Sequence, residues 1–166
     1  MNCLADIDWE AWKPVDPATL VFVVRGEQML LIRKKRGLGA GKINGPGGRL
    51  EAGETPLECA VREVREELGV TPLRLSYAGE NSFQFADGYS IHVHVYRAED
   101  CECEPVETDE AAPLWVRVDR VPYAEMWADD ILWVPLLLRR QPFRGRFLFD
   151  GDRMLDHRLE LLPTTR

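Results

Sequence analysis

Three glutamates at helical spacing are the residues of this sequence best suited to do chemistry. Glu63, Glu66 and Glu67 stand at positions i, i+3 and i+4, so a helix places their carboxylates on one face. Neighbouring like charges on a helix repel one another, and only Arg62 and Arg65 stand close by. A divalent cation relieves this repulsion, and Mg²⁺ prefers oxygen ligands and bridges carboxylates to substrate phosphates. The segment therefore predicts a magnesium site that acts on a phosphorylated molecule.

Clear start and stop signals predict the helix that carries these glutamates. Thr55 suits the N-cap, Pro56 suits the first helical position, and Glu58 can complete a capping box with Thr55. Gly69 marks the end. We expect another face of the helix to pack on the core through an apolar stripe at helical spacing. The stripe consists of Leu57, Ala60, Val61, Val64 and Leu68.

A glycine-rich loop over residues 37–53 precedes this helix. Its segment Gly45-Pro46-Gly47-Gly48 lets the backbone approach a ligand or a metal closely. A backbone carbonyl of this segment can complete a coordination sphere. Loop and helix together are therefore expected to form one site.

The remaining pattern predicts a mixed sheet flanked by helices rather than a doubly wound parallel fold. Strands are expected over residues 19–24, 29–33, 73–85, 90–96, 114–118, 143–149 and 155–161. A second helix is expected within residues 123–140, entered near Asp129-Asp130. Residues 1–17 are expected to be an irregular leader, and residues 18–162 to form a single domain.

Composition limits the possible partners and compartments. The 166 residues carry a net charge of −7, and duplex nucleic acid usually binds basic proteins. No run of about 20 apolar residues indicates a membrane span, and the first residues do not resemble a signal peptide. The four cysteines do not form a disulfide framework, and Cys101-Glu102-Cys103 lacks a second ligand pair for zinc. We expect a cytoplasmic monomer that binds a small molecule.

The segment from Gly48 to Val70 resembles the Nudix box. Gly48 is followed by five residues and Glu54, then by seven residues and the run Arg62-Glu63-Val64-Arg65-Glu66-Glu67-Leu68-Gly69-Val70. The resemblance implies an α/β/α sandwich that hydrolyses a nucleoside diphosphate linked to another group. It also implies that Glu66 and Glu67 bind the metal and that Glu63 is a ligand or the general base. Arg62 would orient Glu63, and Glu54 would pair structurally within the loop and helix.

Beyond the box, the chain resembles the branch of this family that acts on oxidised purine nucleoside triphosphates. Residues 34–41, 106–110 and 126–138 carry this resemblance, together with Asn44-Gly45 and the terminal hairpin. It implies a base pocket lined by Asn44, Trp127, Asp129 and Asp130. It further implies that Thr19 and Lys34 contact the nucleotide, that Gly47 lends its carbonyl to the metal, and that Glu110 is an additional ligand or base. Pro46, Gly48 and Phe83 complete the expected substrate contacts.

The expected base pocket has a coherent chemistry. Trp127 offers a stacking face for a purine, and the Asn44 amide can both donate and accept. Two adjacent carboxylates in a partly dry pocket share a proton, so Asp129 and Asp130 are expected to read different oxidised bases. Where that branch has aromatic residues, this chain has Leu38, Ile43 and Pro46.

The expected function is Mg²⁺-dependent hydrolysis of 8-oxo-dGTP and 2-hydroxy-dATP to the monophosphate and pyrophosphate, which sanitises the nucleotide pool. Mn²⁺ is a possible substitute for Mg²⁺. One alternative is the same chemistry on ADP-ribose, a dinucleoside polyphosphate or an RNA 5′ end, and another is a nucleotide sensor without catalysis. The general base stays open between Glu63 and Glu110. His92 and His94 share one face of an expected strand, and they receive no role, as does His157.

Overall fold

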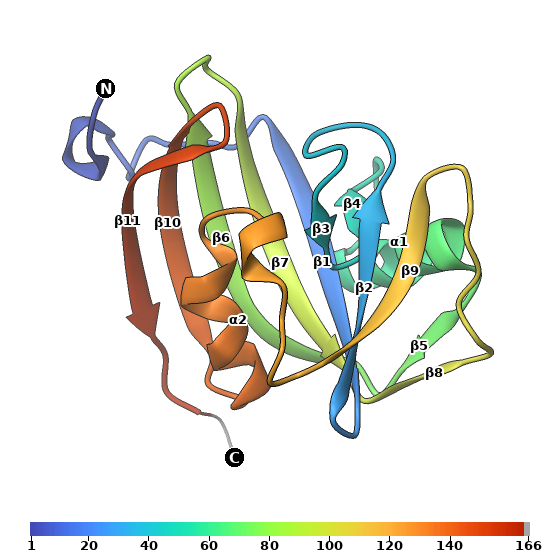
Figure 1. Ribbon diagram of the computed structural model, residues 1–166. Coiled ribbons are helices and arrows are strands. Elements are labelled where there is room, and N and C mark those ends of the chain that lie inside the picture. Colours follow the sequence, from blue (N-terminus) through green and yellow to red (C-terminus); the bar gives the residue numbers. More distant parts are fainter. Residues whose placement is uncertain (165–166) are drawn as a thin grey trace.

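A computed structural model describes residues 1–164 and contains one large mixed sheet, a small second sheet and two α-helices (Figure 1). The strands are β1 (Asp16–Arg25), β2 (Gln28–Lys34), β3 (Ile43–Asn44), β4 (Gly47–Arg49), β5 (Thr71–Leu73), β6 (Ser76–Phe85), β7 (Ser90–Ala98), β8 (Asp100–Glu102), β9 (Ala111–Arg117), β10 (Phe143–Asp150) and β11 (Arg153–Leu161). The helices are α1 (Pro56–Leu68) and α2 (Asp130–Leu138), with 3₁₀ turns η1 (Leu4–Asp6) and η2 (Tyr123–Glu125).

The large sheet has the strand order β11-β10-β6-β7-β1-β2-β3, with β4 paired to β1 and β9 paired to β2. Strand β1 runs parallel to β7, and β10 runs parallel to β6. The hairpins β1–β2, β6–β7 and β10–β11 are antiparallel. The expectation of a mixed sheet is therefore confirmed.

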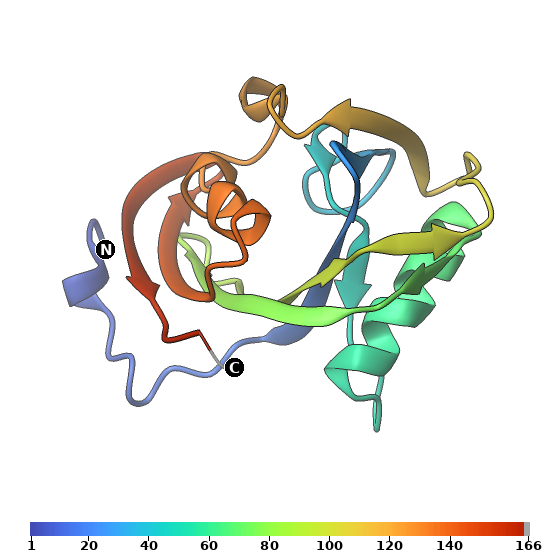
Figure 2. The ribbon, with the colours of Figure 1, turned by 90° about the horizontal axis from the view of Figure 1, so that it is seen from below.

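The two helices lie on opposite faces of the large sheet, as Figure 2 shows in a view from below. Helix α2 covers one core cluster, in which the buried Trp133 packs edge-on against Phe22 and beside Phe143. Helix α1 covers the other cluster through Ala60, Val64 and Leu68. The sheet between helices that the sequence predicts is confirmed.

Helix α1 begins and ends where the sequence predicts. The Thr55 hydroxyl accepts from the Glu58 N–H at 3.2 Å, Glu58 accepts from the Thr55 N–H at 3.0 Å, and Gly69 takes a left-handed conformation. The expected apolar stripe is wrong at Leu57, which is 48% exposed because the buried part of the helix starts only at Cys59.

Several other boundaries differ from the expected ones. The glycine-rich loop contains two short strands, β3 and β4, and the expected strand over residues 73–85 is divided into β5 and β6. Arg74 lies between these strands at a φ of 53°, a left-handed conformation that cannot continue a strand. The second helix, expected within residues 123–140 and entered near Asp129-Asp130, is confirmed as α2, with Asp129 at its N-cap.

The first residues of the chain cross the outer strands of the sheet. The Leu4 N–H donates to Asp156 at 2.8 Å, the Trp12 indole donates to Gln84 at 2.9 Å, and Arg146 lies over the Trp9 ring. Strand β1 starts at Asp16. Within residues 1–164, we find no helix with the length and apolar character needed to cross a membrane.

Candidate active site

Arg62 connects the glycine-rich loop to the acidic face of α1. Its Nε donates to Glu54 Oε2 at 2.6 Å and its Nη2 donates to Glu54 Oε1 at 2.9 Å, a bidentate pair that lowers the pKa of Glu54 to about 2. Its Nη1 donates to Glu63 at 2.7 Å, and its Nη2 also donates to the Arg49 carbonyl at 3.1 Å. The guanidinium therefore fixes the position of the Glu63 carboxylate relative to the loop.

Glu63 and Glu67 of α1 meet Glu110, which lies just before β9. One carboxylate oxygen from each residue lies within 4.8 Å of the other two. Glu67 and Glu110 come together because the Thr108 hydroxyl donates to the Glu67 carbonyl at 2.8 Å, which attaches residues 106–110 to the end of α1. Three carboxylates at this spacing form a set of oxygen donors suited to a divalent cation.

Glu67 is the most buried member of this group, with 4% of its surface exposed. Burial raises its pKa to about 8, while the Gly47 N–H that donates to its Oε1 at 3.1 Å and the charge of Lys34 act in the opposite direction. Burial also raises the pKa of Glu63. Both carboxyls are therefore held where a cation would stabilise their ionised forms.

Glu66 does not join this group. Its carboxylate is half-exposed and accepts from Arg62 Nη1 at 3.1 Å. The structure thus brings together three of the four glutamates expected as ligands. The fourth, Glu66, is hydrogen-bonded to the Arg62 guanidinium, which also donates to Glu63.

Gly47 and Gly48 lie where a side chain has no room. A Cβ on Gly47 would collide with the Thr19 carbonyl, because β4 pairs with β1 at this point. A Cβ on Gly48 would lie 2.6 Å from both carboxylate oxygens of Glu63. The two glycines therefore allow β4 to approach β1 on one side and the carboxylate group on the other.

We expect an alanine at Gly47 to affect mainly the stability of the protein, and an alanine at Gly48 to affect mainly its activity. Gly47→Ala should lower the melting temperature clearly, because its clash is with backbone. Gly48→Ala should lower it less, because the Glu63 side chain can move away, but should reduce hydrolysis by about tenfold or more as Glu63 is displaced. Thermal melts and kcat/KM of the two variants, compared side by side, test this. The expectation would be contradicted if the two variants had the same stability and lost the same amount of activity.

A cavity of about 190 Å³ extends from this group into the face of the sheet that α2 covers. The expected substrate residues found in its wall are Thr19, Lys34, Asn44, Gly47, Gly48, Phe83, Trp127, Asp129 and Asp130. Pro46 is not among them: it is buried, and its carbonyl accepts from the Val21 N–H at 2.8 Å. The contact of Pro46 with the substrate stays a prediction.

Asp129 and Asp130 also line the cavity, each 2% exposed. The Trp133 indole donates to Asp129 Oδ2 at 2.7 Å. Within residues 1–164, no hydrogen-bond partner reaches Asp129 Oδ1 or Asp130 Oδ2. Burial raises the pKa of both carboxyls, and the Asp129 charge raises that of Asp130 further. A buried carboxyl without a partner is a group prepared for a polar ligand.

Trp127 forms a wall beside this pair. Its ring packs edge-on against Phe85 and Phe149, and Lys42 Nζ lies 5.2 Å from its ring centre. Gly39 lies against the indole so closely that a Cβ would be 2.7 Å from Nε1. The Asn44 Oδ1 accepts from the Gly45 N–H at 2.8 Å, which leaves the amide nitrogen to donate.

The cavity wall also contains several residues that were not predicted from the sequence, among them Phe85, Tyr89 and Ile91. Phe85 could have been found, because it stands two residues after Phe83 on the same strand and therefore faces the same side. Tyr89 and Ile91 lie at and after the turn of the β6–β7 hairpin, and no local signal marks them.

Known proteins resemble this chain in sequence and in fold. A family model of the NUDIX domain matches residues 14–137. An oxidized purine nucleoside triphosphate hydrolase from Danio rerio is 46% identical over 144 residues, covering 86% of this chain and 92% of that protein. A protein of the same name from Mus musculus is 41% identical over 143 residues, covering 85% and 92%. A crystal structure of a MutT mutator protein from Bacillus halodurans matches with a TM-score of 0.78 at 29% identity, covering 88% of this chain and 98% of that one.

The chain therefore belongs to the Nudix family of hydrolases, as its box predicts. Within that family it is similar to proteins named oxidized purine nucleoside triphosphate hydrolase over most of its length.

Proposed function

We propose that this protein hydrolyses oxidised purine nucleoside triphosphates, such as 8-oxo-dGTP and 2-hydroxy-dATP, to the monophosphate and pyrophosphate. By removing damaged precursors, it sanitises the nucleotide pool. The observation that carries this proposal is the position of Glu67, which belongs both to the carboxylate group and to the wall of the cavity that Asp129 and Asp130 also line. A nucleotide can therefore have its phosphates at the carboxylates while its base reaches the aspartate pair.

Hydrolases of this family need a divalent metal, and the donors present fit one. Glu63, Glu67 and Glu110 supply carboxylate oxygens, and their close approach is unfavourable without a cation. We propose Mg²⁺, with Mn²⁺ as a substitute, held by these three residues, by the Gly47 carbonyl and by Glu66 once its carboxylate leaves Arg62. When bound, the metal would neutralise phosphate charge.

The chain's own residues would orient the phosphates and accept the proton. Lys34 lies in the cavity wall and places a positive charge beside Glu67. Water attacks a phosphorus of the triphosphate, the new P–O bond forms as the bond between the α and β phosphates breaks, and the water proton passes to a carboxylate. Glu63, positioned by Arg62, and Glu110 are the two candidates for this base.

The base would be held at the other end of the cavity. We propose that Trp127 stacks on the purine, that Asn44 and the Asp129–Asp130 pair read its polar edge, and that Thr19 and Phe83 complete the wall. Gly48 would let the phosphates approach the loop backbone.

A nucleotide panel tests the proposed substrate. With Mg²⁺ present, kcat/KM for 8-oxo-dGTP and 2-hydroxy-dATP should exceed that for dGTP by about tenfold or more, because a pocket with polar groups left unpaired discriminates strongly. Pyrophosphate release is the measurement. Higher kcat/KM for ADP-ribose, a dinucleoside polyphosphate or capped RNA would assign the same chemistry to that substrate. Binding of all nucleotides without turnover would indicate a sensor.

We further propose that residues 18–162 act as one Nudix domain preceded by the segment 1–17, and that the protein is a cytoplasmic monomer. The net charge of −7 disfavours stable binding to duplex nucleic acid. All four cysteines are free, which agrees with a reducing compartment.

A further inference from the structure

The face of the β6–β7 hairpin that turns away from the cavity carries a second cluster of potential ligands. Side chains alternate along a strand, so Phe83, Ile91 and Val93 line the cavity while their neighbours face the other side. On that other side, His94 pairs with Glu80 across the two strands, and His92 pairs with Ser82. The hairpin register thus gathers two imidazoles and one carboxylate at one place.

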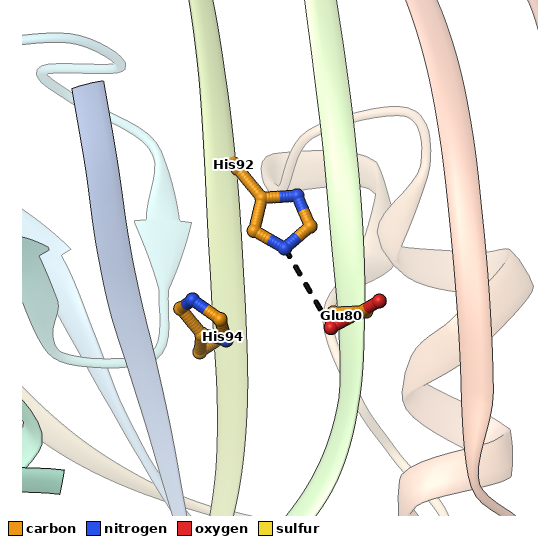
Figure 3. Close-up of side chains that lie close together, drawn as sticks. All are labelled: Glu80, His92 and His94. Carbon is orange, nitrogen blue, oxygen red and sulfur yellow. Dashed lines mark ion pairs between the residues drawn. The ribbon is translucent and has the colours of Figure 1, made fainter. Parts of the chain in front are cut away.

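The three side chains lie close enough to share one ion. One ligand atom from each of Glu80, His92 and His94 lies within 4.8 Å of the other two, and the imidazole rings are 4.9 Å apart. Figure 3 shows the His92 ring directed at Glu80, with His94 beside it on the same strand. The distance from His92 Nε2 to Glu80 Oε2 is 3.6 Å. Two ligands of a tetrahedral zinc ion lie about 3.3 Å apart, so this spacing suits a metal better than a direct hydrogen bond.

Hydrogen bonds around the cluster hold the imidazoles in the form that binds a metal. The Tyr77 hydroxyl donates its proton to Glu80 Oε2 at 2.7 Å, so its contact of 3.1 Å with His94 Nδ1 requires that nitrogen to carry a proton. The His94 Nε2 then has a free lone pair. Ser82 Oγ, 2.8 Å from His92 Nδ1, can accept a proton from that nitrogen in the same way. Histidine ligands of metals commonly donate their other N–H to such an oxygen.

We propose that Glu80, His92 and His94 form a binding site for a divalent transition metal such as Zn²⁺, separate from the active site. Two imidazole nitrogens select Zn²⁺ over Mg²⁺, whereas the carboxylate group of the active site offers only oxygen donors. The bound ion would link β6 to β7 directly behind the wall formed by Phe83, Ile91 and Val93. Three protein ligands leave a fourth position for water.

The positive charge of Arg144 beside the cluster is compatible with this site. Arg144 on β10 donates through Nε to Glu80 Oε1 at 3.1 Å, which leaves Oε2 directed at the histidines. An ionised carboxylate has about four lone-pair positions, so Glu80 can accept from Arg144 and Tyr77 and still bind a cation.

Imidazole ¹H–¹⁵N spectra of the full-length protein, titrated with Zn²⁺ in excess Mg²⁺, test the proposal. The chain has three histidines, so each resonance can be assigned. The Nε2 signals of His92 and His94 should shift together and saturate at one equivalent of Zn²⁺. The exposed His157 serves as an internal control and should not shift. Absence of a shift at His92 and His94, or an equal shift at His157, would overturn the proposal.

Variants provide a second and independent measurement. Equilibrium dialysis should show that His92→Asn with His94→Asn weakens Zn²⁺ binding at least about 100-fold, while His157→Asn leaves it unchanged. Tyr77→Phe keeps all three ligands but removes the hydroxyl that orients two of them, so it should weaken binding by about tenfold. Mg²⁺-dependent nucleotide hydrolysis should persist in each variant and serves as the test of folding. Unchanged Zn²⁺ affinity in the double variant contradicts the site.

Discussion

Glu67→Gln is expected to lower kcat/KM for 8-oxo-dGTP by roughly 10³-fold while the protein remains folded. The substitution removes one negative charge from the carboxylate group that would hold the metal, and it changes no atom elsewhere in the cavity wall. Steady-state kinetics with Mg²⁺ measures the loss. Activity equal to that of the unchanged protein would contradict the role proposed for this carboxylate.

The variant should fold because glutamine resembles the form that Glu67 already takes. Burial raises the Glu67 pKa to about 8, so the metal-free protein holds this side chain mostly protonated near pH 7. An amide has the same shape, and its oxygen can still accept from the Gly47 N–H. The matched control is Glu58→Gln on the same helix, which preserves the capping box and lies outside the carboxylate group, so it should retain full activity.

The same pKa sets the dependence of stability on pH. Between pH 4.5, the ordinary pKa of glutamate, and about 8, the folded protein holds the Glu67 proton and the unfolded chain releases it. Raising the pH through this window therefore favours unfolding of the metal-free protein. Glu67→Gln removes this contribution, so the melting temperature of the variant should rise relative to the parent as the pH increases from about 5 to 8.

Asp129→Asn is expected to change the ratio of kcat/KM for 8-oxo-dGTP to that for 2-hydroxy-dATP by about tenfold or more. If the amide oxygen keeps the hydrogen bond from the Trp133 indole, the amide nitrogen replaces Oδ1 and becomes a fixed donor. The parent pair can share a proton with Asp130 and so present either a donor or an acceptor. Losing one buried hydrogen bond costs about 1–3 kcal/mol, which corresponds to a selectivity change of this size.

The pH dependence of the selectivity ratio distinguishes base reading by the aspartate pair from a general disruption of the cavity. Burial raises the pKa of both aspartates, so the shared proton is present at low pH and is lost as the pH rises. The selectivity ratio of the parent should therefore drift with pH, and that of Asp129→Asn should drift less. Asp119→Asn, at an exposed ion pair with Arg117, is the control and should match the parent. An unchanged ratio in Asp129→Asn would contradict the base-reading role.

Local signals in the sequence predict α1 and its acidic face well. They do not predict how strands that are distant in the sequence pair with one another. The bounds Pro56–Leu68 follow from Thr55, Glu58 and Gly69, which all act within one helical turn of the ends. The parallel pairing of β1 with β7 joins segments far apart in the chain, and no local pattern specifies it. That pairing places Ala18 of β1 beside Val93 of β7, and both residues line the cavity.

In the candidate site, too, some features follow from local sequence and others from long-range contacts. The helical spacing of Glu63 and Glu67 follows from the sequence, but the burial of Glu67 depends on its contact with Gly47, and the position of Glu110 depends on the Thr108 bond to α1. Pro46 is likewise buried where its carbonyl accepts from the Val21 N–H of β1. Contacts between distant segments decided each of these positions.

The alternation along β6 and β7 constrains how this hairpin can change in evolution. Phe83 and Val93 face the cavity, and Ser82 and His92 face the other side, so the function of each position depends on whether its number along the strand is odd or even. A single-residue insertion within β7 would rotate imidazoles into the nucleotide cavity and valines out of it. Insertions and deletions among relatives should therefore be confined to the turn at Asp87-Gly88 or occur in pairs.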